Sequence, residues 1–217
     1  MSTADLSRPG IWTELFPHAL TLMDHLAAQS ENFTWTFGGG TVLMLRINHR
    51  ESKDVDLFIK DPQYLNYVNP RLSDVAENIT SDYDEGAEFI KLYLEPGEID
   101  IVVGASLTPT PFDLITYRGR EIRVETSAEI VAKKFHHRGD RATARDLFDL
   151  CAVAALEPEA ISIALPFMKR HGQAFLDGIH AGAEPLKIQF DKIVTIEFTQ
   201  SFEASVVQAE AIIKTAL

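Results

Sequence analysis

Two carboxylates about a quarter of the way along the chain have the spacing of a metal-binding pair. Asp54 and Asp56 stand two residues apart at the start of an apolar segment, residues 55–59, that is typical of a β-strand. Side chains two apart on a strand leave the same face. Two carboxylates on one face repel each other unless a cation lies between them, and Mg²⁺ is a hard ion that takes carboxylate, water and phosphate oxygens.

Three consecutive glycines precede this pair. Gly38, Gly39 and Gly40 follow a short aromatic segment, residues 33–37, that we predict to be a strand, and they precede an apolar segment, residues 41–47, that we predict to be a helix. Glycines at a strand-to-helix turn let backbone amides approach a phosphate closely. A glycine turn followed by a carboxylate pair indicates a site for a nucleoside triphosphate.

A third carboxylate, Asp100, lies in the otherwise apolar segment 99–103. A lone charge in such a strand is costly unless it is paired or bound to a metal. If this strand neighbours that of Asp54 and Asp56, three carboxylates converge, which suits a site that holds two metal ions.

A second group of charged residues lies in the later half of the chain. Asp146 and Asp149 are three apart and therefore share a helix face. The helix around them, residues 147–156, is apolar almost all round, which predicts burial. Buried Asp149 needs a partner, and three cations are candidates: Lys134, Arg138 and Arg145. Two interpretations stay open, an ion pair that joins two helices or a lysine that stabilises charge on a transferring phosphoryl group.

Composition limits the class of protein. The chain has 217 residues, 46% of them apolar, and a formal net charge of −12, which indicates one domain, or one domain with a helical extension, around an ordinary buried core. The acidic balance disfavours a protein that coats nucleic acid through bulk charge. It leaves room for a local basic site, and residues 133–145 hold five Lys and Arg against one acid, Asp140.

The single cysteine, Cys151, excludes an intramolecular disulfide and fits a reducing compartment. The chain contains no run of about 18 apolar residues and no signal-peptide pattern at its start. We therefore expect a cytoplasmic protein with no membrane partner.

The pattern of elements predicts an α+β fold, in which a mixed sheet over residues 30–125 is followed by a helical half. The expected domains are residues 1–125 and 126–217. The spacing of Thr126 and Glu129 is that of a capping box at the start of the first helix of that half. The expected helices are 11–28, 41–47, 127–137, 143–156, 159–171, 173–181 and 201–216, and the expected strands are 33–37, 55–59, 89–94, 99–103, 115–117 and 122–124. Residues 63–78 stay ambiguous, with a weak helical period.

Other metal-dependent folds also use an Asp-x-Asp pair. Phosphatases of the haloacid-dehalogenase type and many glycosyltransferases place the pair after an apolar strand. Here the preceding residues 49–53 are all polar and the apolar strand follows the pair. That order disfavours both classes.

The order of motifs resembles the polymerase-β-like nucleotidyltransferases and, more narrowly, the AbiEii/AbiGii family of nucleotidyltransferase toxins. Three segments carry the resemblance, and together they span residues 37–150: Phe37-Gly-Gly-Gly-Thr-Val-Leu-Met-Leu-Arg46, His49-Arg-Glu-Ser-Lys-Asp-Val-Asp-Leu-Phe58, and Glu129-Ile-Val-Ala-Lys-Lys-Phe135 followed by Arg145-Asp-Leu-Phe-Asp-Leu150. One departure is Lys133, where many members have an acid. The implied fold is a polymerase-β-like mixed sheet with flanking helices, followed by a helical C-terminal half.

The resemblance also implies roles for individual positions. The triphosphate would be contacted by the family's Gly-Gly-Thr and by an arginine after it: Gly39, Gly40, Thr41 and Arg46. Mg²⁺ would be held by Asp54 and Asp56, with Asp100 as a more variable third ligand. The remaining catalytic positions would be Lys134, Asp146 and Asp149.

The implied reaction is transfer of a nucleoside monophosphate from an NTP to an acceptor hydroxyl, with release of pyrophosphate. In related toxins the acceptor is the 3′ end of tRNA, so the expected partners are an NTP, tRNA and a cognate antitoxin protein. A protein hydroxyl or a small molecule stays open as acceptor. Two alternatives also stay open, a non-catalytic module that binds nucleotide or a partner, and a kinase-like phosphotransferase.

Overall fold

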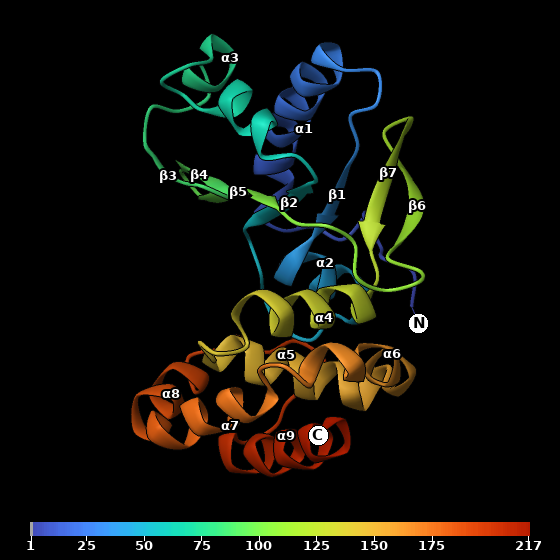
Figure 1. The fold of residues 1–217 in the computed structure, drawn as a ribbon, viewed down its shortest axis with the longest axis vertical. Helices are drawn as coiled ribbons and strands as arrows, with labels where there is room; N and C mark the ends of the chain where they lie inside the picture. The colour runs from blue at the N-terminus through green and yellow to red at the C-terminus, as the bar shows by residue number, and fades with distance from the viewer. Residues whose placement is uncertain (1) are drawn as a thin grey trace.

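The computed structural model describes residues 2–217, and within this range seven strands form one mixed sheet (Figure 1). The order across the sheet is β3-β4-β5-β2-β1-β7-β6, in which β2 pairs with β5, and β1 with β7, in parallel and all other pairs are antiparallel. The strands are β1 (Trp35–Gly38), β2 (Val55–Ile59), β3 (Tyr83–Gly86), β4 (Phe89–Leu94), β5 (Gly97–Val103), β6 (Phe112–Tyr117) and β7 (Arg120–Glu125).

Helices flank the sheet and build the other half of the molecule. In Figure 1, α1 lies with the sheet in the upper part, α2 and α4 lie across the middle, and α5 to α9 lie below them. The helices are α1 (Trp12–Gln29), α2 (Gly39–Ile47), the 3₁₀ helix η1 (Pro62–Val68), α3 (Asp74–Glu77), α4 (Ser127–Arg138), α5 (Ala144–Leu156), α6 (Pro158–Met168), α7 (Gly172–Ala181), α8 (Ala183–Phe190) and α9 (Phe202–Ala216). Among residues 2–217, none of these helices has the length and apolar character that crossing a membrane requires.

Helix α1 is held against the sheet by an aromatic cluster. The ring centroids of Trp12 and Phe16 lie 5.5 Å apart, and those of Phe16 and Phe37 lie 4.7 Å apart. Tyr117 of β6 completes the cluster at 5.3 Å from Phe16. Each such aromatic pair contributes about 0.5–1.5 kcal/mol beyond the area that it buries. The cluster therefore joins the N-terminal helix to β1 and to the edge strand β6.

The predicted capping box at the start of α4 is half confirmed. The side chain of Thr126 accepts a hydrogen bond from the Glu129 amide at 3.3 Å. The Glu129 carboxylate does not return to the Thr126 amide, which donates to the carbonyl of Pro111. It accepts instead from the amides of Leu107 and Thr108 at 2.9 and 2.8 Å. The glutamate thus fastens the loop before β6 to α4.

Most elements lie where the sequence places them. The carboxylate strand is residues 55–59 as predicted. The expected strands 89–94 and 99–103 correspond to the antiparallel pair β4–β5, and the expected strands 115–117 and 122–124 to the antiparallel pair β6–β7. The sequence prediction omits β3 and α8, and the ambiguous stretch 63–78 holds η1 and α3. Strand β7 ends at Glu125 and α4 begins at Ser127, and the division into two domains near this point stays a prediction.

Candidate active site

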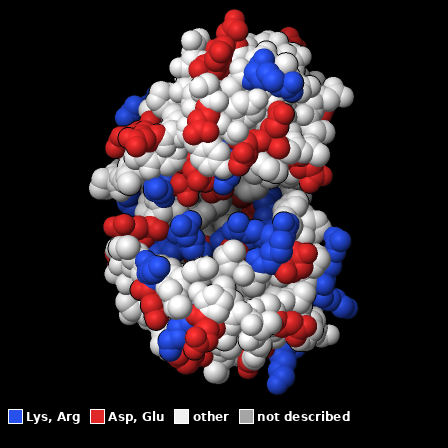
Figure 2. Space-filling model, turned by 90° about the vertical axis from the view of Figure 1, so that its left-hand side faces the viewer, with Lys and Arg blue, Asp and Glu red and all other residues white. Residues whose placement is uncertain are grey.

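A cleft of about 920 Å³ separates the sheet half from the helical half. Figure 2 shows it as a hollow across the middle of the molecule, with acidic residues gathered above it and Lys and Arg below it. Its charged lining holds seven cations and five acids, although the whole chain carries a net charge of −12. The cations are Arg50, Lys53, Lys91, Lys134, Arg138, Arg145 and Lys192, and the acids are Glu51, Asp54, Asp56, Glu98 and Asp100. The volume is in the range that binds a nucleotide-sized ligand.

The acidic wall is built by two neighbouring parallel strands. Asp56 of β2 lies directly opposite Asp100 of β5 in the register of the sheet. Asp54, two residues before Asp56, accepts a long hydrogen bond from the amide of Glu98 at 3.3 Å. The expectation that the strand of Asp100 neighbours that of Asp54 and Asp56 is therefore confirmed.

The glycine turn lies against this wall. Gly39 has a φ of +73°, and a β-carbon at this position would lie 1.8 Å from Asp56 Oδ2. Gly40 lines the cleft beside the Arg50 guanidinium. Thr41 is fully buried and donates its hydroxyl to the carbonyl of Asp54 at 2.5 Å. The turn and the carboxylate strand are thus fixed to each other, with Thr41 as the link rather than as part of the cleft lining.

The two inner carboxylates are shifted toward the protonated form. Burial raises the pKa of Asp56, and repulsion by Asp54 adds to this, although Arg138 and Lys134 offset part of it. Burial and repulsion by Asp56 raise the pKa of Asp100 to about 7. Carboxylates that repel one another in this way are relieved when a cation binds between them.

The donor set fits one magnesium ion. Among residues 2–217 no group of three His, Cys, Asp or Glu side chains lies close enough together to hold a metal ion. Mg²⁺ often uses one or two carboxylates and completes its shell with waters and substrate phosphates. Asp54 and Asp56 supply such a pair, beside a glycine turn that can receive the phosphates.

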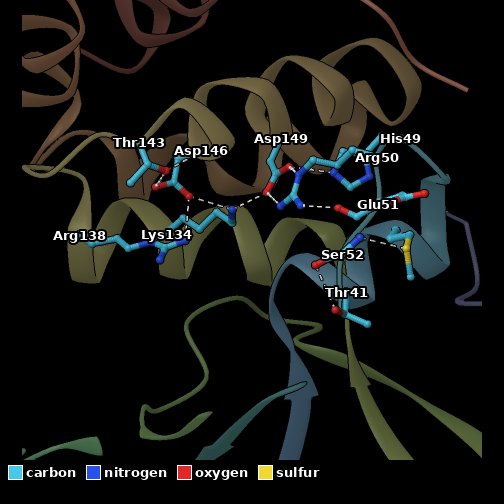
Figure 3. A network of polar contacts seen from close by, with 11 residues as sticks. Thr41, His49, Arg50, Glu51, Ser52, Lys134, Arg138, Thr143, Asp146 and Asp149 are labelled. Carbon is cyan, nitrogen blue, oxygen red and sulfur yellow. Dashed lines mark hydrogen bonds and ion pairs between the residues drawn. The ribbon is translucent and has the colours of Figure 1, made fainter. Parts of the chain in front are cut away.

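The opposite wall rests on a buried ion-pair network (Figure 3). Asp149 of α5 has no exposed surface and accepts from four nitrogens. Arg50 binds it in bidentate fashion through Nε at 2.6 Å and Nη2 at 2.9 Å, His49 donates through Nε2 at 2.8 Å, and Lys134 of α4 donates through Nζ. Burial alone would raise the pKa of Asp149, but Arg50 and Lys134 outweigh it and hold this pKa well below its ordinary value.

His49 enters this network as a neutral ring. Burial lowers its pKa against the opposing effect of Asp149, so at neutral pH its Nε2–H serves as a donor. The ring stacks on Phe148 with centroids 6.0 Å apart.

The neighbouring carboxylate, Asp146, completes the network. It accepts from Lys134 Nζ at 2.8 Å, from Arg138 at 2.8 Å and from the Thr143 hydroxyl at 2.7 Å. Lys134 therefore lies between both acids of α5, as Figure 3 shows. The network contains three cations, Arg50, Lys134 and Arg138, and two carboxylates. Two of these cations, Arg138 and Lys134, are close enough to Asp56 to offset part of the rise in its pKa. The ion pair that joins α4 and α5 is present, and its lysine also lines the cleft.

Arg46 is not brought to this site, contrary to the expectation that it contacts triphosphate. Its side chain has no exposed surface and does not line the cleft. The guanidinium donates to the carbonyls of Glu125 and Val124 at 2.6 and 3.1 Å and pairs with Asp113 at 2.8 Å. It therefore fastens α2 to the end of β7, because α2 directs this side chain away from Gly40.

Four cations of the cleft were not singled out from the sequence: Arg50, Lys53, Lys91 and Lys192. The bonds of Arg50 and His49 to Asp149 were also not anticipated, although Lys134 was among the proposed partners. Arg138 pairs with Asp146 rather than Asp149, and Arg145 pairs with neither. The clue for Arg50 was a charged side chain within a polar segment directly before the carboxylate pair.

One family model matches most of the chain. The family model described as "Nucleotidyl transferase AbiEii toxin, Type IV TA system" matches residues 21–211. A comparison with curated proteins gives no match. Among solved structures, JHP933 from Helicobacter pylori is 15% identical with a TM-score of 0.49, covering 94% of this chain and 90% of that one. The antibiotic-resistance factor ANT(2'')-Ia is 15% identical with a TM-score of 0.48, covering 78% of this chain and 98% of that one. These structural likenesses are distant, and the family assignment rests on the sequence match.

Proposed function

The chain belongs to the family of AbiEii nucleotidyltransferase toxins, and from this premise we propose that it transfers a nucleoside monophosphate from an NTP to the 3′ end of tRNA with the help of Mg²⁺. One observation carries the proposal. Asp54 and Asp56 lie beside the Gly39–Gly40 turn on one wall of the cleft, and the opposite wall of the same cleft is basic. A triphosphate with its metal needs both kinds of wall, since carboxylates hold the cation and cations hold the phosphates.

The proposed reaction balances as a single displacement. The oxygen of the acceptor hydroxyl forms a bond to the α-phosphorus, and the bond from that phosphorus to the oxygen bridging the β-phosphate breaks. Pyrophosphate leaves, and the hydroxyl proton passes to solvent. When Mg²⁺ is bound by Asp54 and Asp56, it neutralises charge on the phosphate oxygens.

Lys134 would stabilise the charge that develops on the phosphoryl group. Its ammonium lines the cleft, and its contacts with Asp146 and Asp149 hold it in one position. A preorganised donor of this kind costs no reorganisation when the reaction occurs. The acids of α5 therefore act as positioning residues for the lysine in this proposal.

An RNA acceptor is supported by cations of the cleft that have no carboxylate partner among residues 2–217. Lys53, Arg145 and Lys192 line the cleft, and none of them makes a side-chain ion pair within that range. Unpaired cations beside a nucleotide site attract the phosphates of a nucleic-acid chain. This local surplus allows an acidic protein to hold RNA. A cognate antitoxin is the proposed partner that restrains the activity.

The test is transfer of label from each of the four α-³²P NTPs to tRNA in the presence of Mg²⁺. We expect label in tRNA with wild-type protein, no label with Asp54→Ala or Asp56→Ala, and undiminished label with Asp24→Ala. Asp24 is a suitable control because it is an exposed carboxylate on α1 that pairs only with Arg120 in the described chain.

Three other outcomes would redirect the proposal. Label in a protein band would move the acceptor to a polypeptide. Equal labelling by wild type and Asp56→Ala would overturn the assigned carboxylates. Absence of label from every acceptor, with NTP still bound, would support the alternative of a non-catalytic nucleotide-binding module.

A further inference from the structure

A lysine ammonium lies within the acidic wall of the cleft. Lys91 of β4 is directly opposite Asp100 of β5 in the antiparallel register, and Asp100 is directly opposite Asp56 of β2 in the parallel register. Residues that are directly opposite each other in a sheet project from the same face. Lys91, Asp100 and Asp56 therefore form one row across three strands, on the face that lines the cleft.

The ammonium is bound by two of the carboxylates in this wall. Lys91 Nζ lies 2.7 Å from Glu98 Oε2 and 3.4 Å from Asp100 Oδ2. Glu98 and Asp100 are two residues apart on β5 and so share a face. The side chains of Lys91 and Glu98 are 30% and 35% exposed, and that of Asp100 is 18% exposed. The contact is thus at the cleft surface, within reach of a ligand.

Four carboxylates share this face, in two pairs. Asp56 lies on β2 and Asp54 directly precedes this strand, whereas Glu98 and Asp100 lie on the adjacent strand β5. Like charges at this spacing repel strongly unless cations lie among them. Glu98 and Asp100 already have a cation beside them, the ammonium of Lys91. Asp54 and Asp56, in contrast, have no lysine or arginine within ion-pair distance among residues 2–217.

We propose that Lys91 takes the place of a second divalent cation, so that the site works with one metal ion at Asp54 and Asp56 and a resident ammonium beside Asp100. This inference rests on the proposed function, because it concerns the same cleft and the same reaction. It differs from the expectation that Asp100 joins the other two carboxylates in a two-metal site. A third ligand is withheld from the metal because the Asp100 carboxylate is directed to Lys91.

Removal of the ammonium should open a second metal position. In Lys91→Ala, the carboxylates of Glu98 and Asp100 lose their counter-ion and Asp56 stays adjacent, which leaves oxygen ligands of the kind that Mg²⁺ and Mn²⁺ prefer. Lys91→Gln also removes the positive charge but keeps a longer side chain than alanine. It is the variant to use if Lys91→Ala perturbs folding. Lys91→Arg keeps the charge.

The experiment counts Mn²⁺ bound per chain by electron paramagnetic resonance, at saturating concentrations of a non-hydrolysable α,β-methylene NTP, with a protein-free sample subtracted. We expect one Mn²⁺ for wild type and Lys91→Arg, and two for Lys91→Ala and Lys91→Gln. The matched control is Lys53→Ala, which removes a different cation of the same cleft and should leave one Mn²⁺. Metal count is the readout, so that a merely structural effect on turnover is not mistaken for support.

The other outcomes separate the inference from the function on which it rests. Two Mn²⁺ in wild type, or one in both neutral Lys91 variants, would overturn the inference and leave the proposed function in place. No Mn²⁺ in wild type and one in the neutral Lys91 variants would overturn the metal role of Asp54 and Asp56. The same result would support the proposal that Lys91 occupies a cation position beside Asp100. No Mn²⁺ in any of them would overturn both.

Discussion

The carboxylate of Asp56 fills the space that a side chain at Gly39 would need. A β-carbon at Gly39 would lie 1.8 Å from Asp56 Oδ2, and the backbone there has a φ of +73°. A side chain at position 39 is therefore disfavoured for two separate reasons, the clash with Asp56 and the left-handed backbone conformation. Because one of these reasons is the carboxylate itself, the shape of the turn and the placement of the proposed metal ligand depend on each other.

Gly39→Ala should therefore reduce transfer more than its effect on folding accounts for. The new methyl group must displace Asp56, and a displacement of about 1 Å at a reacting centre can cost about 100-fold in rate. The measurement is kcat/KM for nucleotidyl transfer, together with the free energy of unfolding in urea.

The chain offers a matched control for the backbone strain. Gly119, in the turn between β6 and β7, has a φ of +82° and nothing within 4 Å of its β-carbon position. Gly119→Ala should lose about 1–2 kcal/mol of stability from the left-handed conformation and keep wild-type activity. Equal activity losses in the two variants would contradict the proposed dependence on Asp56.

Asp149→Asn should be among the most destabilising substitutions in the chain. It leaves Arg50 and Lys134 without their shared buried carboxylate, and breaking a buried ion pair by removing one partner costs about 3–5 kcal/mol. Urea denaturation would measure the loss. Glu203→Gln, which breaks the exposed pair with Lys187, should leave the unfolding midpoint unchanged. A similar small effect for both variants would show that the network is not a stabilising feature.

How much of this could be predicted from the sequence depends on the range of each interaction. The carboxylate strand and helices α4 and α5 have clear local periodicity, and residues 55–59 were predicted with the observed bounds. Strand β3 was not predicted because it is a polar edge strand without apolar alternation. Helix α8 was not predicted because it contains Pro185 and buries only Phe190 among its described residues.

The site shows the same limit. Asp54, Asp56 and the glycines are close in sequence, and their spacing indicated a shared site. The contact of Arg50 with Asp149 joins residues 99 apart, and no local pattern encodes it. The position of Lys91 depends on the register between β4 and β5. The family motif identifies an arginine at position 46 but not the direction of its side chain. The burial of Arg46 at the end of β7 depends on how α2 packs.

The contribution of Asp149 to stability should vanish in acid. Its pKa is well below the ordinary value in the folded protein, whereas the pKa of an aspartate in an unfolded chain is about 3.9. The folded state thus binds this proton less tightly, so the stabilisation is fully present above about pH 5 and is lost as the pH falls through the folded pKa. We expect the stability difference between wild type and Asp149→Asn to be constant from pH 5 to 8 and to shrink below pH 4. A difference that grows on acidification would contradict the assigned direction.

Arg46→Lys should separate a structural role from contact with the nucleotide. A lysine cannot reproduce the hydrogen bonds that the guanidinium donates to Glu125, Val124 and Asp113. Unmet buried acceptors cost about 1–3 kcal/mol each, so the melting temperature should fall. The KM for NTP should keep its wild-type value at a temperature where the variant is folded. A raised KM with an unchanged melting temperature would return Arg46 to the triphosphate site.

The free cations of the cleft should govern how RNA binding depends on salt. Each phosphate contact with a single strand contributes about −0.7 to the slope of log K against log salt concentration. Arg145→Ala and Lys192→Ala each remove one cleft cation without breaking an ion pair of the described chain, so each should make the slope shallower by about 0.7 and weaken binding of the tRNA 3′ end. Fluorescence anisotropy over a series of salt concentrations would measure both. Lys169→Ala is the matched control, because it removes an exposed charge at the end of α6 outside the cleft. If Lys169→Ala changed the slope as much as the two cleft variants, the RNA would be bound by the general surface and not by the cleft that holds Asp54 and Asp56.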